Sequence, residues 1–156
     1  MSLDLKAHMV ESLERVLKFY VNDLEAIDDA RLGQSLGGTA RKPIDFTYEV
    51  AFVNRRIAKR LRGEDPGPFD SEGWITAPEA FQTKAEAIAE LKASVEEVLT
   101  AWKALPDSEL DREIVTPGGN SNPFKMMSMA VNHTNYHDAQ LNYIQSLLGD
   151  DEMHWD

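Results

Sequence analysis

Apolar residues recur every three or four positions along most of the chain, which is the spacing of amphipathic helices. The first such stripe predicts an N-terminal helix of roughly 20 to 30 residues. It consists of Leu5, Met9, Leu13, Val16, Tyr20, Leu24 and Ile27. Residues 33–43 are rich in glycine and show no periodicity, so they predict a connection.

A second helix is predicted between a proline and a glycine. Pro43 suits the first turn of a helix, and Gly63 suits the position just after a C-terminus. The apolar stripe between them is Phe46, Val50, Val53, Ile57 and Leu61. Residues 63–78 then carry three prolines and three glycines. A loop of that length in a compact domain is often functional.

The third helix has two candidate starts. Thr76 with Glu79 and Thr83 with Glu86 each have the spacing of a capping box, in which two side chains bond to free N–H groups of the first turn. The helix is expected to end near Leu105, because a proline follows.

The last helix is predicted to run from Asn122, as its N-cap, to just before Gly149, with Pro123 in its first turn. No strand is expected, since the sequence REIVT is too short to build a sheet. The prediction is therefore an all-α fold, a four-helix bundle, in a single domain covering residues 1–156.

Two histidines interrupt the apolar stripe of the last helix. At about 100° per residue, one narrow face consists of Met126, Ala130, His133, His137, Leu141, Ile144 and Leu148. A buried imidazole needs partners, because an unsatisfied polar group in a core costs about 1–3 kcal/mol. Histidines four residues apart can bind one metal ion, as in HExxH helices, or can be two core residues with ordinary hydrogen bonds. The sequence HTNYH lacks the glutamate of that motif, which excludes a zinc protease of that type.

A metal inside a bundle needs a further ligand from another helix. Glu49 lies at the flank of the second helix's apolar stripe, and Asp45 lies one turn earlier on the same side. A glutamate part-buried beside two histidines has to be paired or metal-bound. His8 and His154 are expected at the surface or rim. By helical angle, Gln140 lies nearest the histidine face. We expect Gln140 and Asp45 not to bind the metal but to hydrogen-bond to the ligands and orient them.

Charge and composition narrow the classes of partner. The chain has 27 acidic and 16 basic residues, a net charge of −11 and no cysteine. This balance disfavours nucleic acid as a partner, and the basic residues 55–62 are expected to form an exposed helix face beside acidic neighbours. No signal peptide is expected, because the first residues mix charges into their apolar positions, and no apolar run comes near the roughly 20 residues that cross a bilayer. A cytoplasmic location without a membrane partner is expected.

The sequence NHTNYHDAQLNYIQSLLGD resembles the last helix of the DinB-like (DinB/YfiT) proteins, a family of metal-dependent four-helix bundles. That family carries a His-x-x-x-His pair followed by a Gly-Gln-Leu-type run, and here Ala139 stands where glycine is common. Residues 45–66 resemble the family's second helix, which usually supplies a third histidine. Glu49 occupies the place of that histidine. The resemblance covers essentially the whole chain.

The resemblance implies a bundle of unusual connectivity, often a homodimer, with a divalent metal near one end. Carried over by residue, His133 and His137 match the paired ligands, and Gln140 matches the glutamine after them. Glu49 either completes a site of two histidines and one carboxylate or marks a member that has lost its metal. Zinc, nickel, iron and manganese all suit such a donor set.

Two functions follow from these observations. The first is a metal-dependent enzyme acting on a small molecule, as a hydrolase or as a transferase that uses a low-molecular-weight thiol, as characterised relatives do. The alternative is a non-catalytic binding or structural bundle with a degenerate or empty metal site.

Overall fold

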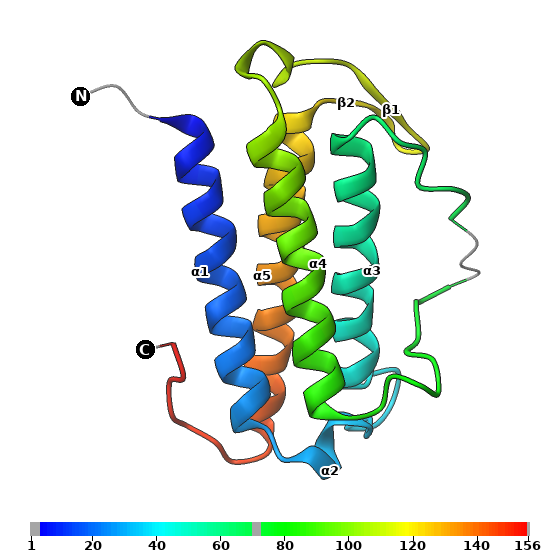
Figure 1. Cartoon of the computed structure of the whole chain (residues 1–156). Helices are drawn as coiled ribbons and strands as arrows, with labels where there is room; N and C mark the ends of the chain where they lie inside the picture. Colours follow the sequence, from blue (N-terminus) through cyan, green and yellow to red (C-terminus); the bar gives the residue numbers. More distant parts are fainter. Residues whose placement is uncertain (1–3, 70–72, 156) are drawn as a thin grey trace.

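The computed structural model describes residues 4–69 and 73–155, which form a bundle of four long helices (Figure 1). The all-α prediction is confirmed. The long helices are α1 (Leu5–Ala26), α3 (Pro43–Leu61), α4 (Lys84–Ala104) and α5 (Pro123–Leu147). The short elements are α2 (Asp29–Leu32), the 3-10 turn η1 (Asp107–Glu109), and the strands β1 (Ile114–Thr116) and β2 (Gly119–Ser121).

The helices are connected in an uncommon order. α1 and α5 run in one direction and α3 and α4 in the other, as Figure 1 shows. α3 and α1 each pack against both α4 and α5, so α1 lies diagonally opposite α3 across the bundle. The described parts of the following connection, residues 62–69 and 73–83, lie along the outside and lead back to the end where α3 began. α4 therefore runs parallel to its neighbour α3, which requires a crossover of this length.

Helix ends follow local hydrogen-bonding chemistry. Asn122 accepts a hydrogen bond from the backbone N–H of Lys125, and Pro123 occupies the first turn of α5, as predicted. Gly63, after α3, has a φ of 78°, a left-handed conformation that favours glycine. For α4 the capping box is Thr83 with Glu86. The alternative start at Thr76 and Glu79 is wrong, because residues 76–83 form an irregular segment ahead of the helix.

A small hairpin corrects the expectation that no strand forms. β1 and β2 pair antiparallel, with Ile114 opposite Ser121 and Thr116 opposite Gly119. Ile114 is buried at the end of the bundle, whereas Val115 is exposed. The hairpin has no hydrophobic core of its own, because Ile114 packs into the core of the bundle. This packing allows strands of only three residues to form.

A layer of polar residues divides the core into two apolar clusters. One cluster contains Met127 and Ala130 of α5, and the other contains Leu141. Between them, α5 buries Thr134, His137 and Asp138. Asn54 of α3 and Ser94 of α4 hydrogen-bond in the same part of the bundle, at 3.4 Å. The histidines thus belong to a buried polar layer with an apolar cluster on each side along the bundle.

The basic segment at the end of α3 has two roles. Arg55 pairs with Glu90 and Glu97 of α4, as the expectation of acidic neighbours requires. Arg56 does not fit the expectation of an exposed helix face, because this residue is only 8% exposed. Its guanidinium donates to the carbonyl oxygens of Pro66, Gly67 and Pro68 at 2.8–3.2 Å, and so fastens the start of the long connection to α3. In the described part of the chain, every helix is too short or too polar to cross a membrane.

Candidate metal centre

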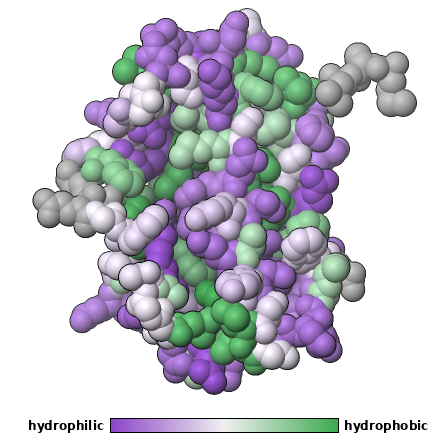
Figure 2. Space-filling view, turned by 180° about the vertical axis from the view of Figure 1, so that it is seen from behind, coloured by the Kyte–Doolittle hydropathy of each residue, from purple (hydrophilic) through white to green (hydrophobic). Residues whose placement is uncertain are grey.

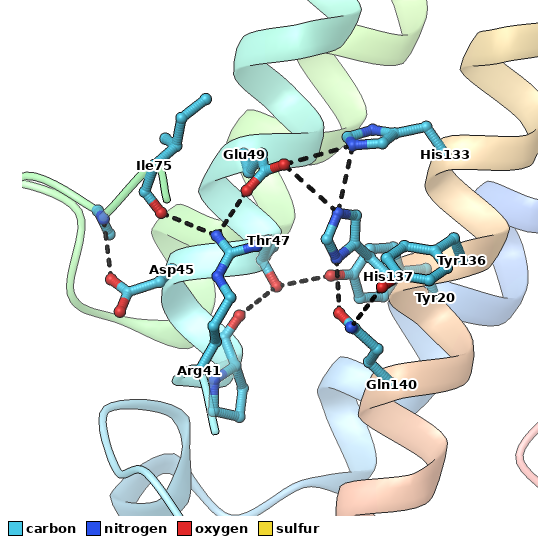
Figure 3. Close-up of polar contacts among 12 residues, drawn as sticks. Tyr20, Arg41, Asp45, Thr47, Glu49, Ile75, His133, Tyr136, His137 and Gln140 are labelled. Atoms are coloured by element: carbon cyan, nitrogen blue, oxygen red, sulfur yellow. Dashed lines mark hydrogen bonds and ion pairs between the residues drawn. The ribbon is translucent and has the colours of Figure 1, made fainter. Parts of the chain in front are cut away.

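Three side chains from two helices converge in the polar layer (Figure 3). His133 and His137 project from successive turns of α5, and Glu49 faces them from α3. Glu49 Oε1 lies 3.6 Å from His133 Nε2 and 3.8 Å from His137 Nε2, and the two Nε2 atoms are 3.2 Å apart. In the described residues, this is the one group of three such side chains whose ligand atoms all lie within 4.8 Å of one another.

These spacings fit a single transition-metal ion. A triangle with sides of 3.2, 3.6 and 3.8 Å has a circumradius of about 2.1 Å, and metal–nitrogen and metal–oxygen bonds to zinc are about 2.0–2.2 Å. One ion can therefore reach all three atoms without a rearrangement of either helix. Two neutral imidazoles and a carboxylate also form a donor set that zinc and the neighbouring divalent metals accept.

Gln140 fixes the orientation of His137. Its Oε1 lies 2.8 Å from His137 Nδ1, and its amide nitrogen donates to the hydroxyl of Tyr136. Because a carbonyl oxygen only accepts, Nδ1 of His137 carries the hydrogen, and the lone pair of the neutral ring is on Nε2, toward Glu49. Phe46 stacks on the same ring at 5.6 Å. His137 is thus held in the form that binds a metal.

His133 is less constrained than its partner. Its side chain is 17% exposed, against 2% for His137. No protein group in the described part of the chain hydrogen-bonds to its Nδ1. Both rings are largely buried, as the stripe on the last helix predicts.

Glu49 is ionised by its surroundings. Burial alone would raise the pKa of its carboxyl, but the contacts with His133, His137 and Arg41 outweigh burial and bring the pKa well below its ordinary value. Arg41 Nη2 lies 2.6 Å from Glu49 Oε2. The arginine therefore holds one carboxylate oxygen and leaves the other, Oε1, toward the histidines.

Arg41 also ties the long connection to this centre. It donates to the carbonyl oxygen of Ile75 at 2.8 Å, and its guanidinium lies over the ring of Trp74 at 5.0 Å. Asp45 acts on the same segment, because its Oδ1 accepts from the backbone N–H of Ala77. The structure therefore directs Asp45 to the connection and not to Glu49 or the histidines, although all are in one region (Figure 3).

A pocket of about 740 Å³ opens over the three side chains. Glu49, Arg41 and the two histidines lie among its lining residues. Much of its wall is apolar, with Phe46 and Ile144 among the lining residues. Such a combination of apolar walls and few convergent polar groups is typical of small-molecule sites.

The other candidate ligands lie elsewhere. His8 is exposed on α1. His154, in the C-terminal segment, pairs with Asp150 at 2.9 Å, and this contact raises the pKa of the imidazole. That segment folds back on α1, where Trp155 stacks on Phe19.

A buried pair of carboxyl groups lies next to the centre and was not foreseen from the sequence. Burial, and then contact with Asp23 of α1, raises the pKa of Asp138 to about 8. Asn142 and Trp155 donate to Asp23 Oδ2 at 2.6 and 3.2 Å. The pair therefore carries a shared proton near neutral pH, and the fold contains it without two full buried charges.

Comparisons with known proteins agree with this architecture. The sequence model of the DinB superfamily matches residues 7–141. The fold is also similar to a crystal structure described as the conserved protein of locus from Enterococcus faecalis, with a TM-score of 0.75 and 15% sequence identity. The match covers 95% of this chain and 99% of that one, and at this identity it shows the fold alone. No curated protein matches the sequence.

Proposed function

The chain belongs to the DinB superfamily, and from this premise we propose that it is a metal-dependent enzyme acting on a small molecule. The observation that carries the proposal is the convergence of Glu49 Oε1 and the Nε2 atoms of His133 and His137 below an apolar pocket. Three protein ligands are the number found in catalytic zinc sites, where a further position stays open for substrate.

We propose that Glu49, His133 and His137 hold one divalent ion, with zinc, nickel, iron and manganese as candidates. When bound, such an ion supplies Lewis acidity to a substrate oxygen or sulfur atom. Arg41 keeps Glu49 ionised and turned toward the histidines, and Gln140 keeps His137 Nε2 free to bind. A substrate that fills the pocket would displace water from its apolar walls, which strengthens electrostatic interactions in the site.

The reaction class follows from what the pocket lacks. Within the described residues, its lining contains no serine, cysteine or lysine. Its hydroxyl groups belong to Thr39, Tyr136 and Tyr143, which are all exposed residues. The attacking group would therefore come from outside the protein, as water in a hydrolase or as a low-molecular-weight thiol in a transferase. We propose these two classes and no particular substrate.

One observation favours the non-catalytic alternative. Glu49 already forms an ion pair with Arg41, and the imidazoles contact each other at 3.2 Å, so part of the centre has partners without an ion, although Nδ1 of His133 has none among the described residues. A bundle that keeps the three residues only as a polar layer would then bind no metal.

Metal analysis separates the two functions. Purified protein is loaded with zinc, dialysed, and measured for metal content by mass spectrometry. We expect one equivalent in the wild type and in the control His8→Ala, whose histidine is exposed on α1. The double variant His133→Ala/His137→Ala should hold less than a tenth of an equivalent while its circular dichroism stays helical. A wild type without bound metal would refute the metal-dependent function.

A further inference from the structure

The mouth of the pocket over the metal centre carries exposed apolar side chains. Trp74, Tyr136, Tyr143 and Leu147 are between 57% and 73% exposed, and all four line the pocket. Figure 2 shows hydrophobic residues gathered on the lower part of the face seen from behind. Exposed apolar residues that cluster around one pocket, unlike single scattered ones, indicate a binding surface.

The floor of the pocket is polar and carries no net charge. Arg41 and Glu49 are its only charged lining residues in the described part of the chain, and they form an ion pair. A polyanion or a sugar would find too few polar partners here. An apolar molecule with one polar end fits, because its body can lie against the mouth and its end can reach the floor.

Charge decides what that polar end is. Once a divalent ion is bound, the charges of Arg41 and Glu49 cancel, and the two neutral imidazoles leave the ion's two positive charges uncompensated. A part-buried charge without compensation is unfavourable. Arg41 also retains a buried Nε–H without a hydrogen-bond partner among the described residues. A negatively charged group on the ligand would offset the charge of the ion.

We infer that this pocket binds a small apolar anion, with its anionic group at the metal and Arg41 and its ring system between Trp74 and Tyr143. The inference names the substrate class of the proposed enzyme and rests on that proposed function. Rings are favoured over flexible chains, because the aromatic side chains of Trp74, Tyr136 and Tyr143 among the lining residues offer flat faces for stacking.

Calorimetry with matched probes tests the inference. Zinc-loaded protein, with its zinc content measured in parallel, is titrated with 2-naphthoate, with the neutral isostere 2-naphthamide, and with acetate. We expect naphthoate to bind about tenfold or more tightly than naphthamide, because a hydrogen bond to a charged group is the stronger one. Acetate, which has the charge but no ring, should show no saturable binding at millimolar concentration.

Variants assign the two ends of the ligand. Trp74→Ala should weaken naphthoate and naphthamide alike, by about fivefold or more. Arg41→Met should weaken naphthoate more than naphthamide, provided that it still holds its zinc. Because Arg41 also lies over the ring of Trp74, naphthamide binding should fall as well, but by the smaller factor. Val115→Ala is the control, since Val115 is equally exposed but lies on the hairpin outside this pocket.

The outcomes are distinguishable. Equal affinities for naphthoate and naphthamide in protein that holds its zinc would overturn the inference and leave the metal centre intact. The same holds if neither probe binds and light scattering shows a dimer that Leu147→Asp dissociates, because a second copy would then cover the mouth. Protein that holds no zinc would overturn both the proposed function and this inference.

Discussion

Replacing Glu49 by glutamine removes one charge from the centre and almost no volume. The carboxylate is 14% exposed and contacts three partners, namely His133, His137 and Arg41. In the proposed site it is the only anionic ligand. Removal of groups that merely support a ligand lowers metal affinity about 10- to 100-fold. We therefore expect loss of the ligand itself to raise the zinc Kd by about 100-fold or more.

The same change has a separate effect on the metal-free protein. Arg41 loses its carboxylate partner in a place where its side chain is 13% exposed, and it keeps the carbonyl oxygen of Ile75 and the ring of Trp74. A hydrogen bond to a charged group contributes about 1.5–3 kcal/mol. The unfolding free energy of the metal-free Glu49→Gln variant should fall by about that amount, without loss of the helical spectrum.

Two measurements follow both effects. Competition with a chromophoric chelator gives the zinc Kd, and urea unfolding followed by circular dichroism gives the stability. Glu11→Gln, at an exposed position on α1, is the matched control. Glu49→His should recover most of the zinc affinity, because the imidazole supplies a neutral ligand at the same place. An unchanged zinc Kd in Glu49→Gln would show that Glu49 is not a ligand.

Three other predictions concern stability and partners. Asp138 keeps its proton in the folded state up to its pKa of about 8, whereas the unfolded chain releases that proton near pH 3.8. The unfolding free energy of the metal-free protein should therefore fall as the pH rises between these two values. The contribution of this group is up to about 1.4 kcal/mol per pH unit. Asp138→Asn should flatten that slope in urea titrations at several pH values, and an unchanged slope would contradict the pKa. Arg56→Met removes three hydrogen bonds to residues 66–68, so limited proteolysis should cut the long connection faster in this variant. The control is Lys59→Met, at an exposed position on α3, and the expected difference in cleavage rate is at least several-fold. Equal rates would show that Arg56 does not hold the loop. With a net charge of −11, the protein should show no salt-sensitive binding to duplex DNA in fluorescence anisotropy, and micromolar affinity that falls steeply with salt would overturn this prediction.

The sequence predicts the bundle well, because helix periodicity and end chemistry are local. Asn122, Pro123 and the pair Thr83–Glu86 act on backbone groups within one turn, so their roles can be read without the fold. The spacing of His133 and His137 is also local, since α5 alone brings the rings together. Glu49 depends on how α3 packs against α5, and the two available signals were its place beside an apolar stripe and the resemblance to the family's second helix.

The surroundings of the centre depend on long-range contacts that no local pattern encodes. Arg41 and Trp74 lie in two connections without periodicity, more than 30 positions apart, and meet only because the second connection folds back past α3. Asp45 has the spacing of a residue that faces the histidines, yet the backbone of Ala77 competes for it. In the sequence, nothing distinguishes Asp23 and Asp138 from exposed aspartates. They are buried together only because α1 packs against α5.

In the proposed metal centre, one ion lies between Glu49, His133 and His137. Anomalous-difference diffraction at the zinc edge, from crystals of the zinc-loaded protein, tests it most directly. We predict a single strong peak about 2.0–2.2 Å from Glu49 Oε1 and from both Nε2 atoms. A zinc-saturated crystal with no peak at this position, or with its strongest peak on other side chains, would show that these three residues do not form the metal centre.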